Sequence, residues 1–149
     1  MAFAEGTTVE LETSVSQIVT MVRRAGGERV GQFHDNDKYH VWFTLDERQM
    51  RFSVPLALEY SGPSRSGNGR AIDQRKWIDQ RNRQKGRALM LVIKAKLESV
   101  ESGVETLEQA FLANIVMADG KTVYERIQEP LAIEYAGGVP GTLLIGQST

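Results

Sequence analysis

The chain of 149 residues contains no cysteine, and this absence removes several kinds of chemistry at once. Disulfide bonds, thiolate metal sites and a catalytic thiol are all excluded, because each needs a cysteine sulfur. The opening segment MAFAEGTTVELE lacks the basic and apolar regions of a secretory signal, and no run approaches the roughly 18 apolar residues of a membrane span. We therefore expect a soluble, unsecreted protein that does not contact a membrane.

The length fits a single domain spanning residues 1–149. A chain of this size buries roughly two thirds of its unfolded surface, which suffices for a core without covalent cross-links. Residues 1–12 and 137–149 lack a clear pairing pattern, and we treat them as candidate flexible arms. Residues 61–70, SGPSRSGNGR, are rich in Gly and Ser without apolar periodicity, which predicts a flexible loop.

The first half of the chain predicts one helix followed by three strands. Apolar residues at i, i+3, i+4 and i+7 predict a short helix over about 14–25, which ends at two glycines. The preceding TTVELE is compatible with a short strand. Three alternating runs, 29–35, 39–47 and 48–60, predict an antiparallel meander, with regular pairing ending near Pro55.

A long helix is predicted from Ala71 to Val100, with Gly86 as a weak point worth about 1 kcal/mol relative to Ala. At 100° per residue, the apolar side chains of its second half surround most of the helix. That pattern is typical of an element covered on nearly every side, so we predict a central core helix. These side chains are Ala88, Leu89, Met90, Leu91, Val92, Ile93, Ala95, Leu97 and Val100.

Two short helices are predicted in the last third, because Thr106-Leu-Glu-Gln109 and Thr122-Val-Tyr-Glu125 have capping-box spacing. The second helix is expected to be disturbed near Pro130. The alternative is a hairpin in NIVMADGKTVYE with Asp-Gly as a type I′ turn, but the capping pattern favours the helix. The whole order predicts an α+β fold, α-β-β-β-α-α-α: short helix, three-stranded antiparallel sheet, long central helix and two short helices.

The charge is strongly divided along the chain, although the net charge is only −1. Between Arg65 and Lys96 ten Lys or Arg face only Asp73 and Asp79, a local charge of +8, and the remainder of the chain carries −9. Such asymmetry is informative about partners. We select nine of these cations as candidate nucleic-acid-binding residues: Arg65, Arg70, Arg75, Lys76, Arg81, Arg83, Lys85, Arg87 and Lys94.

Four of the cations are spaced to share one side of the long helix. Lys76, Arg83, Arg87 and Lys94 fall within about 40° of one another and run for roughly 27 Å on an unbroken helix. A stripe of this kind suits phosphate contacts along a nucleic-acid backbone. The alternatives are a solvated face that keeps an apolar helix in solution, or a face that pairs with acidic residues elsewhere.

The sequence gives little support for catalysis, and we predict no catalytic residue, no metal site and no cofactor. The loop sequence GNGR is neither a P-loop nor a dinucleotide fingerprint, and no GxSxG motif supports a hydrolase triad. His34 and His40 flank a predicted turn, where a weak metal site is conceivable. The clustered carboxylates have a simpler explanation as turn residues; they are Asp35, Asp37, Asp46, Glu47 and Glu59.

Two motifs, RALMLVIKAKLESVESG and FLANIVMADGKTV, resemble a family of small uncharacterised proteins of bacteriophage and prophage genomes, and MRFSVPL resembles the same family's strand before its variable loop. The resemblance covers about two thirds of the chain by eye. It implies a phage setting and a location in the host-cell cytoplasm, and it assigns no activity or site residue. Where related sequences have Trp, this chain has Gly86.

Three functions are compatible with these observations. The first is a phage nucleic-acid-binding accessory protein; the helix, three strands and long helix also resemble the topology of double-stranded RNA-binding domains, which is an analogy of fold alone. The second is a non-enzymatic protein that binds or inhibits a host protein, including one of antiviral defence. The third is sequestration of a phosphate-bearing small molecule. A homo-oligomer is compatible with all three.

Overall fold

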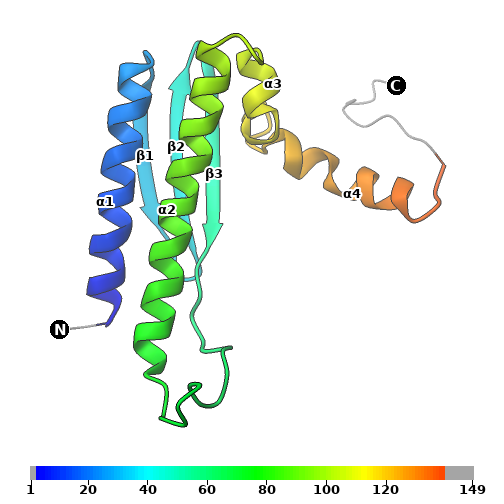
Figure 1. Cartoon of the computed structure of the whole chain (residues 1–149). Helices are drawn as coiled ribbons and strands as arrows, with labels where there is room; N and C mark the ends of the chain where they lie inside the picture. The colour runs from blue at the N-terminus through cyan, green and yellow to red at the C-terminus, as the bar shows by residue number, and fades with distance from the viewer. Residues whose placement is uncertain (1–2, 140–149) are drawn as a thin grey trace.

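The computed structural model describes residues 3–139, with side chains described from residue 11 onward, and its order of elements confirms the predicted α+β fold (Figure 1). The three strands form one antiparallel sheet in the order β1-β2-β3. None of the described helices is long and apolar enough to cross a membrane. The elements are α1 (Phe3–Arg24), β1 (Glu28–His34), β2 (Lys38–Leu45), β3 (Arg48–Pro55), α2 (Gln74–Glu101), α3 (Leu107–Phe111), the 3-10 helix η1 (Leu112–Asn114) and α4 (Val123–Tyr135).

The body of the molecule has two layers, because α1 and α2 lie side by side on one face of the sheet (Figure 1). In β2 every second side chain from Tyr39 to Leu45 is buried, as expected for a sheet covered on one side. The ring of Phe111, on α3, lies 6.1 Å from that of Phe43 and 6.2 Å from that of Phe52. The core therefore fills the space between sheet and helices, and α3 closes one end.

The first helix is longer than the sequence predicts. α1 covers most of the segment 1–12 that we treated as a flexible arm, and the short strand at TTVELE is wrong, because residues 7–12 are helical. Leu11 explains the extension: it is 2% exposed and lies one turn before the predicted apolar face, so that face begins earlier than the window 14–25. The buried positions of α1 are Leu11, Val15, Ile18 and Val22.

α2 is continuous through Gly86, and the two long helices approach each other closely there. Gly86 is buried, and a Cβ atom at this position would lie only 3.0 Å from Cδ2 of Leu11. The lost helix propensity of glycine is therefore balanced by close packing between α1 and α2. The helix begins three residues later than predicted, because the Asp73 carboxylate caps it by accepting from the amide of Lys76.

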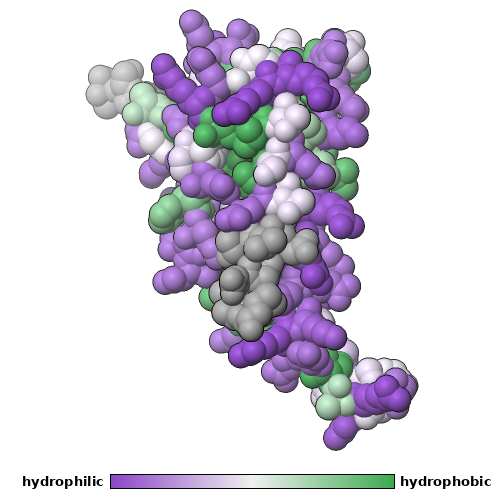
Figure 2. Space-filling view, turned by 90° about the vertical axis from the view of Figure 1, so that its left-hand side faces the viewer, coloured by the Kyte–Doolittle hydropathy of each residue, from purple (hydrophilic) through white to green (hydrophobic). Residues whose placement is uncertain are grey.

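The prediction that the second half of α2 is covered on nearly every side is wrong. Ile93 is fully buried, but Leu91 and Val92 are 52% and 45% exposed, and Ala88 and Ala95 are exposed beside them. The sheet and α1 cover only one side of the helix, and no described element lies over its outward side (Figure 1). Figure 2 shows the side of the molecule that lies on the left in Figure 1. Unlike the outward side of α2, it is covered mostly by hydrophilic side chains, and its apolar surface is confined to small areas.

The last third begins as a short addition to the sheet and ends as a helix. The amide of Val116 donates to the carbonyl of Gln49 at 2.8 Å, next to β3. Thr122 and Glu125 then form the predicted capping box of α4, so the helix is confirmed and the hairpin is reduced to a single bridge between Val116 and Thr122. α4 extends away from the two-layer body (Figure 1). Most of the predicted arm 137–149 lies outside the described residues.

Candidate nucleic-acid interface

Five of the nine predicted cations belong to one end of the molecule. The loop after β3 and the first turns of α2 extend beyond the sheet there (Figure 1). Arg65 and Arg70 come from the loop, and Arg75, Lys76 and Arg81 come from α2; all five are exposed. We call these five residues the basic end.

A buried amide fixes the loop to the helix. The Oδ1 atom of Asn82, a residue that is only 2% exposed, accepts from the amide of Ala57 at 2.8 Å, and its Nδ2 donates to the Ala57 carbonyl at 3.1 Å. The side chain thus pairs with the backbone as a neighbouring strand would. Farther along, the amide of Ser66 donates to the carbonyl of Arg70 at 3.1 Å. The predicted loop is confirmed, and its flexibility stays a prediction.

Trp77 fills the space between this loop and α2. Its ring meets that of Tyr60 edge-on, with centroids 4.9 Å apart, and a Cβ on Gly62 would lie 2.8 Å from the indole nitrogen. The guanidinium carbon of Arg81 lies 4.8 Å from the Trp77 ring centroid, a cation–π contact. A hollow of about 220 Å³ at this point is lined by Trp77, Gln80, Arg81 and Gln84.

The remaining four predicted cations lie farther along α2. Because α2 is unbroken, Arg83, Arg87 and Lys94 share one stripe with Lys76 as the spacing predicts, and all four are exposed. Lys85 is on a separate flank, and its ammonium donates to the carbonyl of Pro55 at 2.7 Å. That lysine therefore also fastens β3 to α2.

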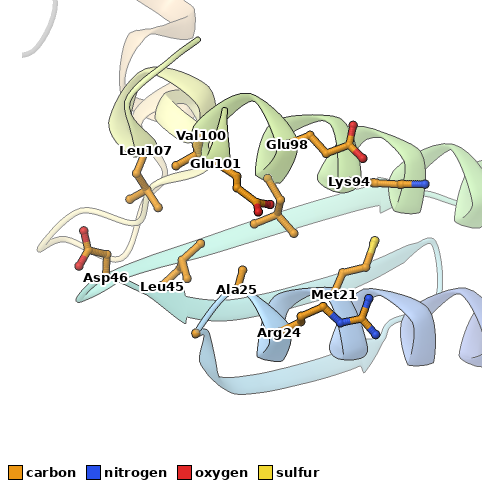
Figure 3. Close-up of a pocket in the computed structure, with 12 residues that line it drawn as sticks. Met21, Arg24, Ala25, Leu45, Asp46, Lys94, Glu98, Val100, Glu101 and Leu107 are labelled. Atoms are coloured by element: carbon orange, nitrogen blue, oxygen red, sulfur yellow. The ribbon is translucent and has the colours of Figure 1, made fainter. Parts of the chain in front are cut away.

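Lys94, at the far end of the stripe, has acidic neighbours. It lines a groove of about 720 Å³ between α1, α2 and α3, and Figure 3 shows apolar side chains such as Met21 and Val100 lying among charged ones. The positive charge of this cation is thus offset locally, unlike that of the basic end. The charged residues of the groove are Arg24, Asp46, Lys94, Glu98 and Glu101.

The charges of α2 oppose its macrodipole. Arg75 and Lys76 occupy the first turn, where the dipole is positive, and the last turn has no basic residue. An acidic group at this terminus is the N-cap Asp73, whose carboxylate accepts from the amide of Lys76. Among the described residues, no carboxylate lies within 4.0 Å of a cation of the basic end. The five cations therefore outnumber the acidic residues among them, Asp73 and Asp79, and this end keeps a net positive charge.

The two histidines lie on opposite faces of the sheet. Strand pairing sets His34 beside Tyr39, on the side of the helices, and His40 beside Phe33, on the opposite face of the sheet. In the described part of the chain, no group of three or more His, Asp or Glu side chains could hold a metal ion.

Sequence reasoning selected the cations but missed the side chains that position them. Asn82 lies on the same face of α2 as Ile78 and Gly86, and a polar residue on an apolar face indicates a hydrogen-bonding role. The contact of Tyr60 with Trp77 spans the whole loop, and no local pattern could have revealed it.

Comparisons with known proteins give no further guidance, since no family model, no curated protein and no solved structure matches this chain. The resemblance to phage proteins therefore rests on the quoted motifs alone.

Proposed function

We propose that this protein is a small phage or prophage accessory protein of the host cytoplasm that binds nucleic acid through phosphate contacts at the basic end and carries out no catalytic step. The observation that carries the proposal is the set of five exposed cations without a carboxylate partner in the described fold, two of which stand at the positive end of α2.

Folding stability does not account for this arrangement. A cation at the positive end of a helix dipole costs about 0.3–1 kcal/mol when exposed, so Arg75 and Lys76 weaken the helix that carries them. An external phosphate offsets this cost, because the side chains of Arg75 and Lys76 attract it, while the helix terminus itself is capped by Asp73. The loop arginines Arg65 and Arg70 add two further phosphate ligands at the same end.

The aromatic contact prepares one cation for binding. The cation–π contact with Trp77 restrains the guanidinium of Arg81, so less side-chain entropy is lost when its N–H groups meet a phosphate. Trp77 is itself held by Tyr60 of the loop. The loop and the helix therefore present their cations as one unit.

The test measures the affinity of the protein for a labelled 20-base oligonucleotide and the matching duplex as the salt concentration rises from 50 to 200 mM. We expect Kd to rise steeply, with a slope of about 0.7–0.9 in log units per phosphate contact. The double variant Arg70→Glu with Lys76→Glu should abolish binding at 200 mM salt.

A matched control reverses two charges at the opposite end of the molecule. Arg23→Glu with Arg24→Glu makes the same change in net charge in the last turn of α1, which lies at the opposite end of the molecule from the basic end (Figure 1). We expect this variant to keep most of the affinity. The proposal fails if the wild-type protein shows no binding at 50 mM salt, or if both double variants lose affinity equally.

One observation favours a protein partner as a second candidate. The outward side of α2 exposes Leu91 and Val92 next to Ala88 and Ala95, and a contiguous apolar strip of this kind is a common docking element. A pull-down from nuclease-treated host lysate distinguishes the two, because a partner that survives nuclease is a protein. Sequestration of a small phosphate compound at the basic end is least favoured, since the hollow at Trp77 holds only about 220 Å³ and ligand pockets span roughly 300–1,000 Å³.

A further inference from the structure

The face of the sheet turned away from α1 and α2 carries a second surface, distinct from the basic end. A groove of about 770 Å³ runs between the outward side chains of the sheet and the chain that leads into α4. Its sheet side is formed by alternate residues of the three strands, and its other wall comes from η1 and α4. Its lining includes Phe33, Lys38, His40, Trp42, Arg51 and Tyr124.

Three aromatic rings lie next to one another on the floor of this groove. Trp42 lies against the backbone of Gly31, where an added Cβ would come within 2.4 Å of the indole, so any other residue at position 31 would displace the ring. Phe33 and His40 stack with their centroids 6.2 Å apart and an interplanar angle of 21°. We call Phe33, His40 and Trp42 the aromatic platform. Across the groove, Tyr124 of α4 is 52% exposed.

The platform is more open than sheet stability requires. Cross-strand aromatic pairs stabilise a sheet by roughly 0.2–1 kcal/mol, which accounts for the contact between Phe33 and His40. It does not account for a phenyl ring that is still 56% exposed, or for a tyrosine on the opposite wall. Flat rings lying side by side in an open groove are suited to a partner that is itself flat.

The charge of the groove favours an anion. Glu125 is the only acidic side chain in its lining, and Arg51 pairs with that carboxylate at 2.6 Å. Lys38 has no such counter-charge within 4.0 Å among the described residues. The groove therefore combines aromatic faces with a net positive charge, and this combination complements bases linked by phosphates.

The groove also adjoins the basic end. Lys38 pairs with Pro55 at one end of the ladder between β2 and β3, and the carbonyl of Pro55 accepts from Lys85 of α2. The strand then leads directly into the loop that carries Arg65 and Arg70. The end of the ladder and the chain that follows β3 thus link the groove to the basic end.

We infer that the aromatic platform stacks the bases of single-stranded nucleic acid, and that the nucleic acid bound by this protein is therefore single-stranded. The inference rests on the proposed function. It adds a second contact surface, and it adds a preference for a single strand over a duplex, which phosphate contacts alone would not give. In a duplex the base faces are already stacked on each other, so only an unpaired strand offers them to Trp42 and Phe33.

The test compares three labelled probes of equal length at 100 mM salt: oligothymidylate, a strand with the same phosphates but abasic sugars, and a duplex. We expect oligothymidylate to bind most tightly. Trp42→Ala should raise its Kd on the order of 10-fold, the loss typical of one stacked base. The Kd of the abasic strand should not change, and Trp42→Phe should restore part of the affinity.

A direct optical reading uses the variant Trp77→Phe, in which Trp42 is the only tryptophan. Oligothymidylate should quench its fluorescence, and the abasic strand should not. Leu91→Ala, on the outward side of α2, is the control for loss of an exposed apolar side chain and should leave all three affinities unchanged.

The outcomes separate this inference from the proposed function. If the wild-type protein binds all three probes with equal affinity and Trp42→Ala changes none of them, the platform is overturned while binding at the basic end stands. If no probe binds at 50 mM salt, the proposed function fails first. A sedimentation experiment in which Trp42→Ala converts a dimer to a monomer would also overturn the inference, because the groove would then hold a second copy of the chain.

Discussion

At the scale of single residues, Glu125 connects three parts of the molecule. Its carboxylate accepts from the Thr122 amide at 2.7 Å, which begins α4, and from Arg51 of β3 at 2.6 Å. The hydrogen bond from the Thr122 amide is the main reason why the pKa of Glu125 lies below its ordinary value, and the charge of Arg51 adds to it. Arg51 also donates to the carbonyl of Gly120 at 3.0 Å. These contacts hold the wall of the groove in place.

We predict that this arrangement weakens in acid. A carboxylate with a lowered pKa in the folded state stabilises the fold above its ordinary pKa of 4.5, and the contribution is lost as the pH falls through the lower folded value. Glu125→Gln keeps an acceptor for the Thr122 amide but removes the charge. The Tm of the wild type should therefore exceed that of Glu125→Gln at pH 7, and the difference should shrink as the pH falls below 4.5 and through the lower folded pKa. A difference that does not shrink as the pH falls would contradict the assignment.

At the scale of elements, the two halves of α2 have different roles: the second half stabilises the core and the first half carries the cations. Its second half packs Ile93 into the core, and its first half carries cations against the helix dipole. Gly86 lies between the two halves and packs closely against Leu11 of α1. The helix is thus held by its contacts with the core and α1, while its projecting end is left to meet a ligand.

The two sides of α2 predict different responses to the same substitution. Ile93→Ala should lower the free energy of unfolding by about 2–5 kcal/mol, because it leaves a cavity in the core. Leu91→Ala, two residues away, should change it by no more than about 0.5 kcal/mol, as is usual for an exposed position. Urea denaturation measures both. An equal loss in the two variants would mean that the outward side of α2 is covered in solution.

At the scale of the whole molecule, the described structure is a two-layer body with two projections. The body holds the hydrophobic core between the sheet and the two long helices, the basic end extends from one end, and α4 extends from the side (Figure 1). α4 exposes Leu131, Ile133 and Tyr135, so little apolar burial secures its second half. Stability is therefore expected to be unevenly distributed.

Native-state hydrogen exchange should reveal this gradient. The amides of β2, which is paired on both sides, should exchange only through global unfolding, and those of α4 beyond Ile127 should exchange far faster through local opening. The exposed amides of the loop 61–70 should also exchange fast. Equal protection of β2 and α4 would show that α4 is docked in solution, against the body or a second copy.

The order of the elements followed from local patterns, because capping residues, turn formers and apolar periodicity are each written within a few neighbouring residues. Thr122 and Glu125 are an example, since their spacing alone decided between helix and hairpin. The cations of the basic end were also visible in the sequence, as a cluster of one sign. The extent of α1 was missed, because the face that begins at Leu11 is recognised only when it packs against Gly86.

Sequence by itself therefore determined the fold class and the position of the basic segment along the chain. Tertiary structure decided which side of α2 stays open, that Asn82 and Trp77 hold the loop, and that Phe33, His40 and Trp42 meet on the uncovered face of the sheet. The reason is physical. Periodicity shows which residues share a face, but whether a face is covered depends on how many other elements reach it, and here only one side of the sheet and one side of α2 are covered.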